Sequence, residues 1–430
     1  MTQKNNLIFV SIASYRDPEL LPTLRDLFVK AKNPELLRVG ICWQKSEDES
    51  IEEFIYNENV RLYTCPWHMS KGACWARHVI QKHLYSNEEY YFQLDSHHRF
   101  LENWDEHLKN LYKEAEDTGS KPIIGTYGTT YFPDTPDAPL LNEPYRIHLF
   151  DTFGSDGDII SRPQPIINHL DLKKNNINLI PARCLSGHFI FAKGNFCKDC
   201  IYDPNLYFRG EEITLSARAY THGYDMFHPT YSIVWHEYLR KEKSKHWDDH
   251  VETNGFEINH EVRNMRSKQR QRALLGMDLS NLDFKHYGLG NRRSLHEYEL
   301  YCGVDFLNRR VHKLAARLED GNKEPEPFTM SEEEWESGML KEQHITVKWE
   351  FDQIPTNTMF DFWFFGFEDK DDKLLWRKDI NYDDSFHLDF FNKKKNSHHV
   401  DFSCQGEIDH CVIIPHIRDG DWSDKIIIKV

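Results

Sequence analysis

The stretch Tyr90-Tyr91-Phe92-Gln93-Leu94-Asp95-Ser96-His97-His98 joins an apolar run to a polar end. Its first five residues are rich in aromatic side chains, which indicates a short strand inside a sheet. Asp95 and His97 lie two residues apart, so in extended backbone their side chains point the same way. Both can then reach one divalent cation. A strand cap followed by a solvated histidine pair is the alternative interpretation.

The segments before this stretch alternate between strand-like and helix-like patterns. Short apolar runs predict strands and longer amphipathic runs predict helices, in the order 7–13 (strand), a helix opened by Pro18, 37–44 (strand), 60–64 (strand) and 73–84 (helix). This alternation predicts an α/β fold with a doubly wound, mostly parallel sheet. Ligands of such sheets bind beyond the carboxyl ends of the strands. Ser14–Asp17 and Asp95–His97 both lie at such ends, which favours the cation interpretation.

The length of 430 residues predicts two domains, because a single hydrophobic core rarely supports a chain of this size. We expect a first domain over 1–318, a charged linker over 319–340 and a β-rich domain over 341–430. The last part alternates with period two or contains aromatic runs, which predicts a small β-sandwich with strands near 345–351, 360–365, 387–390, 412–415 and 426–428. We expect the irregular stretch 127–181 to shape a substrate cleft, to act as a lid, or to be a plain surface excursion.

The composition excludes several classes of partner. With 53 Lys and Arg against 69 Asp and Glu, the net charge of −16 argues against nucleic acid or an anionic membrane as the main partner. We see no signal-peptide pattern and no run of about 20 apolar residues that spans a bilayer. The nine cysteines are scattered, which favours a reduced, cytoplasmic protein.

Four further segments carry groups suited to chemistry. Arg77 follows a glycine at the start of a helix and can pair with a phosphate or with a carboxylate. Ser186-Gly187-His188 is a turn that admits a ligand close to the backbone, or a simple turn. Glu211 and Glu212 near a helix start can orient an acceptor hydroxyl, or act as capping carboxylates. His236 ends an apolar run and can add a third cation ligand, although such histidines are usually structural.

Together these segments resemble the N-acetylglucosaminyltransferases of glycosyltransferase family 60, whose members include a cytoplasmic enzyme that modifies hydroxyproline. The resemblance covers roughly residues 5–305 in the order of the family. It is carried by 10–20 (Val-Ser-Ile-Ala-Ser-Tyr-Arg-Asp-Pro-Glu-Leu), 72–77 (Gly-Ala-Cys-Trp-Ala-Arg), 93–100 (Gln-Leu-Asp-Ser-His-His-Arg-Phe), 185–191, 202–213, 236–240, 287–290 and 293–298. The part after Trp335 has no counterpart in it.

The resemblance implies a GT-A fold, UDP-GlcNAc as the donor, a divalent cation such as Mn²⁺ or Mg²⁺, and retention of anomeric configuration. It assigns the cation to Asp95, His97 and His236, and the acceptor end of the sugar to Glu211 and Glu212. It places donor binding at Ser14, Tyr15, Arg16, Asp17 and Arg77, and we add Gly187 and His188 as donor-site candidates. The chain departs from the family pattern at Ala73 and at Glu237, where a proline and a second histidine are common.

Two alternatives to this function stay open. One is an inverting GT-A transferase in which a glutamate acts as general base, and the other is a sugar-binding or scaffold protein with a decayed active site. The acceptor is a hydroxyl group on a protein or a glycan. The C-terminal domain is expected to bind carbohydrate, recruit the acceptor or pair the protomers of a homo-oligomer.

Overall fold

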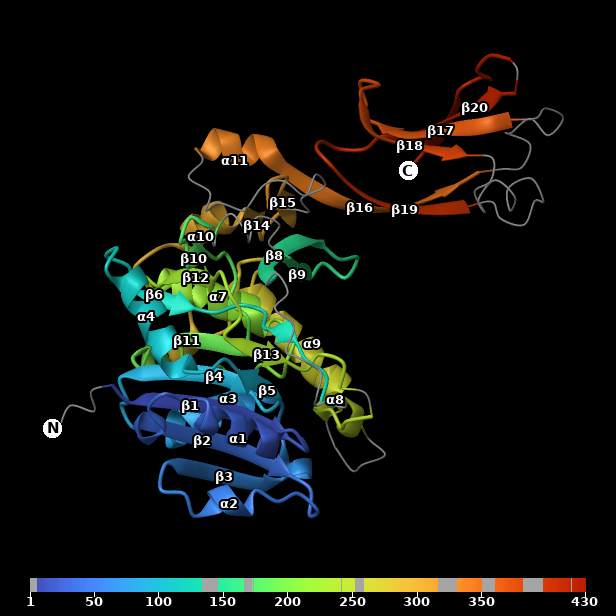
Figure 1. Cartoon of the computed structure of the whole chain (residues 1–430). Coiled ribbons are helices and arrows are strands. Elements are labelled where there is room, and N and C mark those ends of the chain that lie inside the picture. Colours follow the sequence, from blue (N-terminus) through green and yellow to red (C-terminus); the bar gives the residue numbers. More distant parts are fainter. Residues whose placement is uncertain are drawn as a thin grey trace. The chain divides into compact units, whose positions relative to one another are not determined.

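The computed structural model describes residues 6–133, 146–165, 172, 174–240, 242–251, 259–315, 331–349, 360–381, 397–418 and 420–430. The chain divides into two compact units (Figure 1). The first consists of Met1–Asp151, Ser161–Asn308 and Leu314–Glu332, and the second of Thr152–Ile160, Arg309–Lys313 and Glu333–Val430. Of the expected linker, residues 319–330 lie outside the described residues, and Glu332–Gly338 forms the helix α11.

The first unit is built on an eight-stranded sheet with the strand order β10-β12-β6-β11-β4-β1-β2-β3. All pairs between β3 and β4 are parallel, and β6 pairs with β12 in parallel, whereas β10 and β11 run antiparallel to their neighbours. The predicted mostly parallel α/β sheet is therefore confirmed. The strands are β1 (Ile8–Tyr15), β2 (Leu37–Lys45), β3 (Val60–Pro66), β4 (Tyr90–Asp95), β6 (Pro122–Ile124), β10 (Leu179–Pro181), β11 (Phe189–Lys193) and β12 (Asp225–Pro229).

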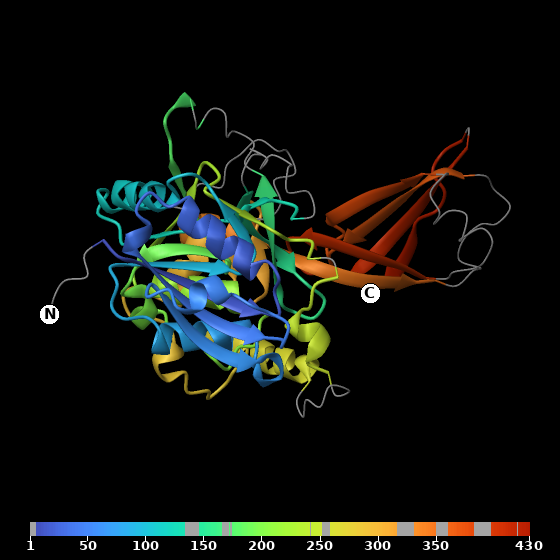
Figure 2. The same ribbon diagram turned by 60° about the horizontal axis from the view of Figure 1, so that its bottom comes forward.

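Helices cover both faces of this sheet, because its strands are apolar on both sides. The helices α1 (Leu20–Val29) and α4 (Trp104–Glu116) share a buried core with alternate residues of β1. Their ribbons lie on the same side of the sheet in Figure 2. On the opposite face, α3 (Ala73–His83) approaches β2 closely, since a Cβ at Gly40 would lie 2.4 Å from the Phe9 ring and 3.2 Å from Ile80.

A second, three-stranded sheet lies beyond the carboxyl end of β4. Its strand order is β5-β13-β7, with β5 (His98–Phe100), β13 (Val234–His236) and β7 (Thr129–Thr130). The antiparallel pairing of β13 with β5 sets His236 opposite His98, and so brings it next to Asp95 and His97. A mostly parallel sheet with this small sheet at its edge is the GT-A type of fold that the resemblance implies.

No helix in the described ranges is long and apolar enough to cross a membrane.

The remaining elements of the first unit connect these layers. The connecting elements are η1 (Pro34–Leu36), α2 (Glu52–Ile55), η2 (Trp67–Met69), α6 (Phe196–Asp199), α7 (Glu211–Thr221), α8 (His246–Asp249), α9 (His260–Leu274), η4 (Lys285–Tyr287), α10 (Leu295–Cys302) and β14 (Val304–Asp305). The hairpin β8 (Arg146–Phe153) and β9 (Ile159–Pro165) contributes its tip to the second unit.

The second unit is a β-sandwich, as predicted. One sheet contains β15 (Arg310–His312), β16 (Met339–Lys348) and β19 (Ser397–Cys404), and the other has the order β18-β17-β20-β21. Both sheets contribute to one core, in which the rings of Phe367 and Phe402 stack 4.7 Å apart. The strand expected over 387–390 lies outside the described residues. The strands of the second sheet are β17 (Phe360–Glu368), β18 (Leu374–Asn381), β20 (His410–Ile417) and β21 (Ile426–Lys429).

Candidate functional site

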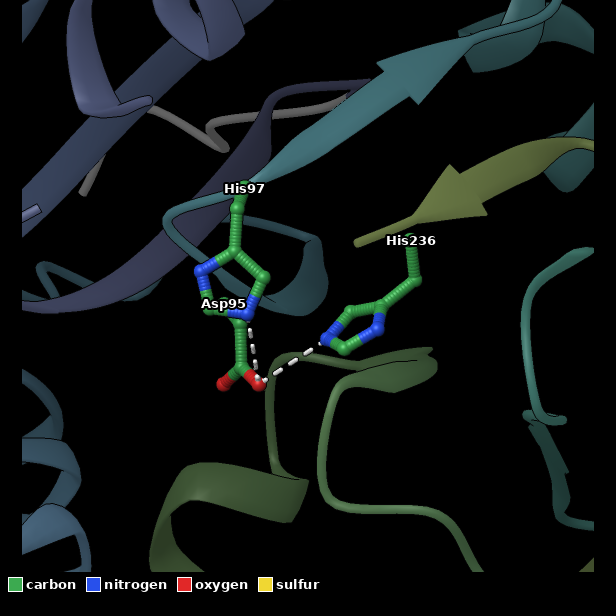
Figure 3. Close-up of side chains that lie close together, drawn as sticks. All are labelled: Asp95, His97 and His236. Carbon is green, nitrogen blue, oxygen red and sulfur yellow. Dashed lines mark hydrogen bonds and ion pairs between the residues drawn. The ribbon is translucent and has the colours of Figure 1, made fainter. Parts of the chain in front are cut away.

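Asp95, His97 and His236 converge where β4 ends and β13 ends (Figure 3). Nε2 of His236 lies 3.4 Å and Nε2 of His97 lies 3.8 Å from the same carboxylate oxygen, Oδ2 of Asp95. One ligand atom from each residue falls within 4.8 Å of the others. One carboxylate and two imidazoles from the ends of two strands thus face a common point, which is a donor set for a divalent cation.

A buried carboxylate fixes the ring of His97. Oδ2 of Asp17, in the loop after β1, accepts hydrogen bonds from Nδ1 of His97 at 2.7 Å and from Oγ of Ser96 at 2.6 Å. Burial opposes the charge of Asp17, but His97 and Arg240 outweigh it and hold the pKa of Asp17 below its usual range. Because Nδ1 is engaged by Asp17, Nε2 is the nitrogen of His97 that faces Asp95. Such carboxylate–histidine pairs orient metal ligands in many proteins.

His236 is held by packing. Its ring centroid lies 4.3 Å from that of His188, 4.9 Å from that of His98 and 4.3 Å from that of Tyr238. Nδ1 of His236 is buried and has no hydrogen-bond partner among the described residues. Burial lowers the pKa of His236 to about 4, with His97 adding to the effect and Asp95 opposing it. The ring is therefore neutral at physiological pH, which is the form that binds metals.

His188 supports this cluster rather than facing its centre. The backbone N–H of Gly128 donates to Nε2 of His188 at 3.2 Å. Nε2 thus accepts, and Nδ1 carries the hydrogen that it donates to Oγ of Ser186 at 2.8 Å. Burial lowers the pKa of His188 well below its usual value. His188 is a neutral positioning residue beneath His236.

Arg77 ties the cation cluster to the acidic pair. Its Nη2 lies 2.7 Å from Oδ1 of Asp95, and its Nη1 pairs with Oε1 of Glu211. The side chain of Arg77 is 4% exposed, so both ion pairs are shielded from water on the arginine side. Burial opposes the charge of Asp95, but His236 and Arg77 hold the pKa of Asp95 well below its usual range. Oδ1 of Asp95 is thus engaged by Arg77, and Oδ2 faces the two histidines.

The two adjacent glutamates at the start of α7 have different surroundings. Glu211 is buried and accepts a hydrogen bond from the Tyr202 hydroxyl at 2.5 Å besides its pair with Arg77. Glu212 is half-buried and accepts from the backbone N–H of Gly187 at 2.8 Å and from the Tyr127 hydroxyl at 3.3 Å. Burial raises the pKa of both carboxyls, against the opposing charge of Arg77. Glu211 is a structural partner of Arg77, and Glu212 is the more accessible acid.

Gly187 is required by close packing at this junction. A Cβ there would lie 2.7 Å from Oε1 of Glu211 and 2.9 Å from Nη1 of Arg77. Its carbonyl oxygen also accepts a hydrogen bond from Nε2 of Gln93 at 2.6 Å. The turn predicted at 186–188 therefore lies directly over the Arg77–Glu211 pair.

The residues at the end of β1 form a second polar group. The Tyr15 hydroxyl and Nη1 of Arg16 donate to the same oxygen of Asp249, at 2.9 Å and 2.8 Å. The Arg16 guanidinium also lies 5.0 Å from the centre of the Trp67 ring. Arg16 adopts a φ of +43°, which is uncommon for a residue with a side chain. The Ser14 hydroxyl is buried and has no hydrogen-bond partner within the described ranges.

Several contributors were missed in the sequence. Tyr202 and Asp249 connect segments far apart in the chain. Tyr202 begins the segment 202–213 that resembles family 60, whereas Asp249 carried no local signal. Arg240 has a φ of +36°, and its Nη2 lies 3.4 Å from Oδ2 of Asp17. Arg240 belongs to a segment that resembles family 60, which was the available signal. Glu237, where the family often has histidine, forms a 2.6 Å ion pair with Lys243 and is not part of the cation cluster.

Comparison with known proteins identifies one family. Residues 7–55 and 49–308 match the family model described as Glycosyltransferase (GlcNAc), which is more than half of the chain. No curated protein matches.

Among solved structures, the chain is similar to GalNAc-T7 with UDP, GalNAc and Mn²⁺, at 14% identity and a TM-score of 0.45 over 68% of this chain. The chain spans 56% of the length of that structure. It is also similar to residues 1–349 of S. aureus TarS in complex with UDP-GlcNAc, at 13% identity and a TM-score of 0.36, over 62% of this chain and 72% of TarS.

Proposed function

Because the chain belongs to the Glycosyltransferase (GlcNAc) family, we propose that it transfers N-acetylglucosamine from UDP-GlcNAc to a hydroxyl group of a protein or glycan. The observation that carries the proposal is the convergence of Asp95, His97 and His236 beyond the carboxyl end of the central sheet. Nucleotide ligands of open α/β sheets bind at this edge. A reduced, cytoplasmic setting is part of the proposal, supported by nine free, buried cysteines.

A divalent cation fits these residues. Asp95 offers the oxygen Oδ2, and each histidine offers its Nε2. Asp17 holds the tautomer of His97, and burial keeps His236 uncharged. Two imidazole ligands favour the transition ion Mn²⁺ over Mg²⁺. Such an ion supplies positive charge that offsets the charge developing on a departing diphosphate.

The residues around the cluster then divide the work of binding. We assign the uridine to the end of β1, where Ser14 offers a buried hydroxyl with no other hydrogen-bond partner within the described ranges. Tyr15 and Arg16, both bound to Asp249, shape that end of the site. Arg77 holds Asp95 in place, so its effect on the nucleotide acts through that carboxylate.

In the transfer, the acceptor oxygen bonds to C1 of the sugar while the bond from C1 to the diphosphate oxygen breaks. In a retaining reaction, the acceptor proton passes to the departing phosphate oxygen on the same face. Glu212, the more accessible acid, orients an acceptor or sugar hydroxyl from its position beside Gly187. Glu211 acts through Arg77 and is a positioning residue.

Inversion, with Glu212 as general base, is the second candidate, because burial raises the pKa of Glu212 toward the range that suits a base. The anomeric configuration of the product distinguishes the retaining from the inverting mechanism. If Glu212 deprotonated the acceptor and the acceptor displaced UDP directly, the configuration at C1 would invert, so a product with retained configuration excludes this mechanism.

The proposal is tested by turnover of UDP-GlcNAc with Mn²⁺, first as slow hydrolysis without acceptor and then as a mass increase on candidate acceptor proteins. Asp95→Ala should abolish turnover while the chain stays folded. The matched control is Asp361→Ala, which also removes an aspartate beside a histidine, here 2.7 Å from His416 in the second unit. Full activity of Asp95→Ala, or full activity of the wild type in saturating EDTA, would overturn the cation role.

A further inference from the structure

A second group of metal-ligating side chains lies on the outer face of β16 and β19, in the second unit. Across these antiparallel strands, His344 pairs with Asp401, and Thr346 pairs with His399. The alternate residues, such as Val347 and Phe402, point into the sandwich core. The side chains of His344, His399 and Asp401 are 28%, 54% and 56% exposed, so they meet at the surface.

Both histidines aim one nitrogen at the same carboxylate oxygen. Nδ1 of His344 lies 2.7 Å and Nε2 of His399 lies 3.0 Å from Oδ1 of Asp401. Ligand atoms of the three residues fall within 4.8 Å of one another. The set therefore repeats the chemistry of the cluster in the first unit, with two imidazoles and one carboxylate.

The other nitrogen of each ring already faces an oxygen atom. Nδ1 of His399 lies 2.9 Å from Oγ1 of Thr346, and Nε2 of His344 lies 3.4 Å from the backbone carbonyl of Phe153. These contacts orient the rings in the way that outer partners orient metal-bound histidines.

The surroundings of His344 allow either a second proton on its ring or a cation bound beside it. Its two nitrogens face a carbonyl and a carboxylate, which both accept hydrogen bonds, whereas a neutral imidazole has only one N–H. Either the ring carries a second proton, or a cation lies between Nδ1 and Asp401. If a cation is bound there, Nε2–H of His344 donates to the carbonyl of Phe153, and Nε2 of His399 can bind the same cation.

We propose that His344, His399 and Asp401 form a binding site for a divalent transition metal such as Zn²⁺, separate from the cluster at Asp95. The ion would link β16 to β19 and, through His344, hold the segment at Phe153 against them. A third cluster consists of Glu368, Asp372 and His410. It is a poorer cation site, because Nζ of Lys425 lies 2.8 Å from Glu368 and already neutralises its charge.

The test measures, by equilibrium dialysis, how much Zn²⁺ the full chain binds. The chain carries His97→Ala and His236→Ala, because these two changes remove the first cluster. We expect one equivalent of Zn²⁺ per chain and a raised melting temperature on its addition. Adding His399→Ala and Asp401→Ala should remove that equivalent and the shift. Because these side chains are exposed, the variants should remain folded, and His344→Gln provides a milder second variant.

The matched control is His416→Ala in the same background, which removes a histidine of the second unit paired only with Asp361 among the carboxylates described. It should keep the equivalent. The proposal would be overturned if the chain with only the first cluster removed bound no Zn²⁺. It would also be overturned if the bound Zn²⁺ persisted after His399→Ala and Asp401→Ala and was lost with His410→Ala. Neither result bears on the proposed transfer, because the wild type with the first cluster intact tests that separately.

Discussion

Replacing Arg77 with methionine should destabilise the protein strongly, because Arg77 neutralises two carboxylates in a shielded setting. Its side chain is 4% exposed and that of Glu211 is 6% exposed. Removing one partner of such a pair leaves a buried charge without compensation, which costs about 3–5 kcal/mol of unfolding free energy. Methionine retains most of the side-chain length, so the change tests charge rather than volume. Urea unfolding of the purified chain measures the effect.

The loss should also depend on pH. Burial already raises the pKa of Glu211 against the effect of Arg77, and without the arginine this pKa rises further. A carboxyl whose pKa is higher folded than unfolded binds more protons in the folded state, so unfolding free energy falls as pH rises. Arg77→Met should thus lose more stability at pH 8 than at pH 5, and adding Glu211→Gln should restore part of it.

The matched control is Arg25→Met, which breaks an exposed ion pair between Arg25 and Glu53 at 2.6 Å. Exposed pairs contribute little because water screens them, so this variant should unfold like the wild type. If Arg77→Met unfolds like Arg25→Met, or if its stability loss is the same at both pH values, the account of the buried Arg77 is wrong.

Three further predictions concern the same site. Asp17→Asn should weaken Mn²⁺ binding about 10–100-fold in calorimetric titrations, because His97 loses its orienting carboxylate; unchanged affinity would argue against that role. Gly187→Ala should destabilise the chain by about 1–3 kcal/mol in thermal unfolding, since the added Cβ overlaps Glu211; a wild-type melting temperature would contradict the packing. Because the pKa of His236 is lowered to about 4, its contribution to stability is present above the unfolded value near 6.5 and is lost as pH falls toward 4. His236→Gln should therefore show a shallower decline in stability between pH 6.5 and 4, and an identical decline would refute the lowered pKa.

The sequence predicted those parts of the molecule that depend on local patterns. The alternation of short apolar runs with amphipathic segments predicted the mostly parallel sheet, and period-two patterning predicted the C-terminal sandwich. Asp95 and His97 were paired correctly in space because they follow one strand at a spacing of two. Spacing alone could not select His236, which is 141 residues from Asp95. Its place at the end of an apolar run made it one possible ligand, and the family resemblance assigned it to the cation site.

The contacts that the sequence did not predict depend on tertiary structure. The assignment of Asp17 to the donor site stays a prediction, but no pattern in the sequence indicated that the turn after β1 also brings it to His97, 80 residues away. The sequence allowed Arg77 to pair with a carboxylate but did not indicate which one, and α3 and α7 pack so that it pairs with Glu211, 134 residues away. The sequence also did not indicate which of the two adjacent acids at the start of α7, Glu211 or Glu212, is buried. The packing of α7 makes that distinction.

The central claim is that Asp95, His97 and His236 bind the cation of the donor. The most direct measurement is a crystal structure of the full chain with UDP-GlcNAc and Mn²⁺, with diffraction data collected at the manganese absorption edge. The account predicts one anomalous peak in the first unit, within bonding distance of Oδ2 of Asp95 and of Nε2 of both histidines, with diphosphate oxygens beside it. A manganese peak on the diphosphate that none of these three residues contacts would contradict it.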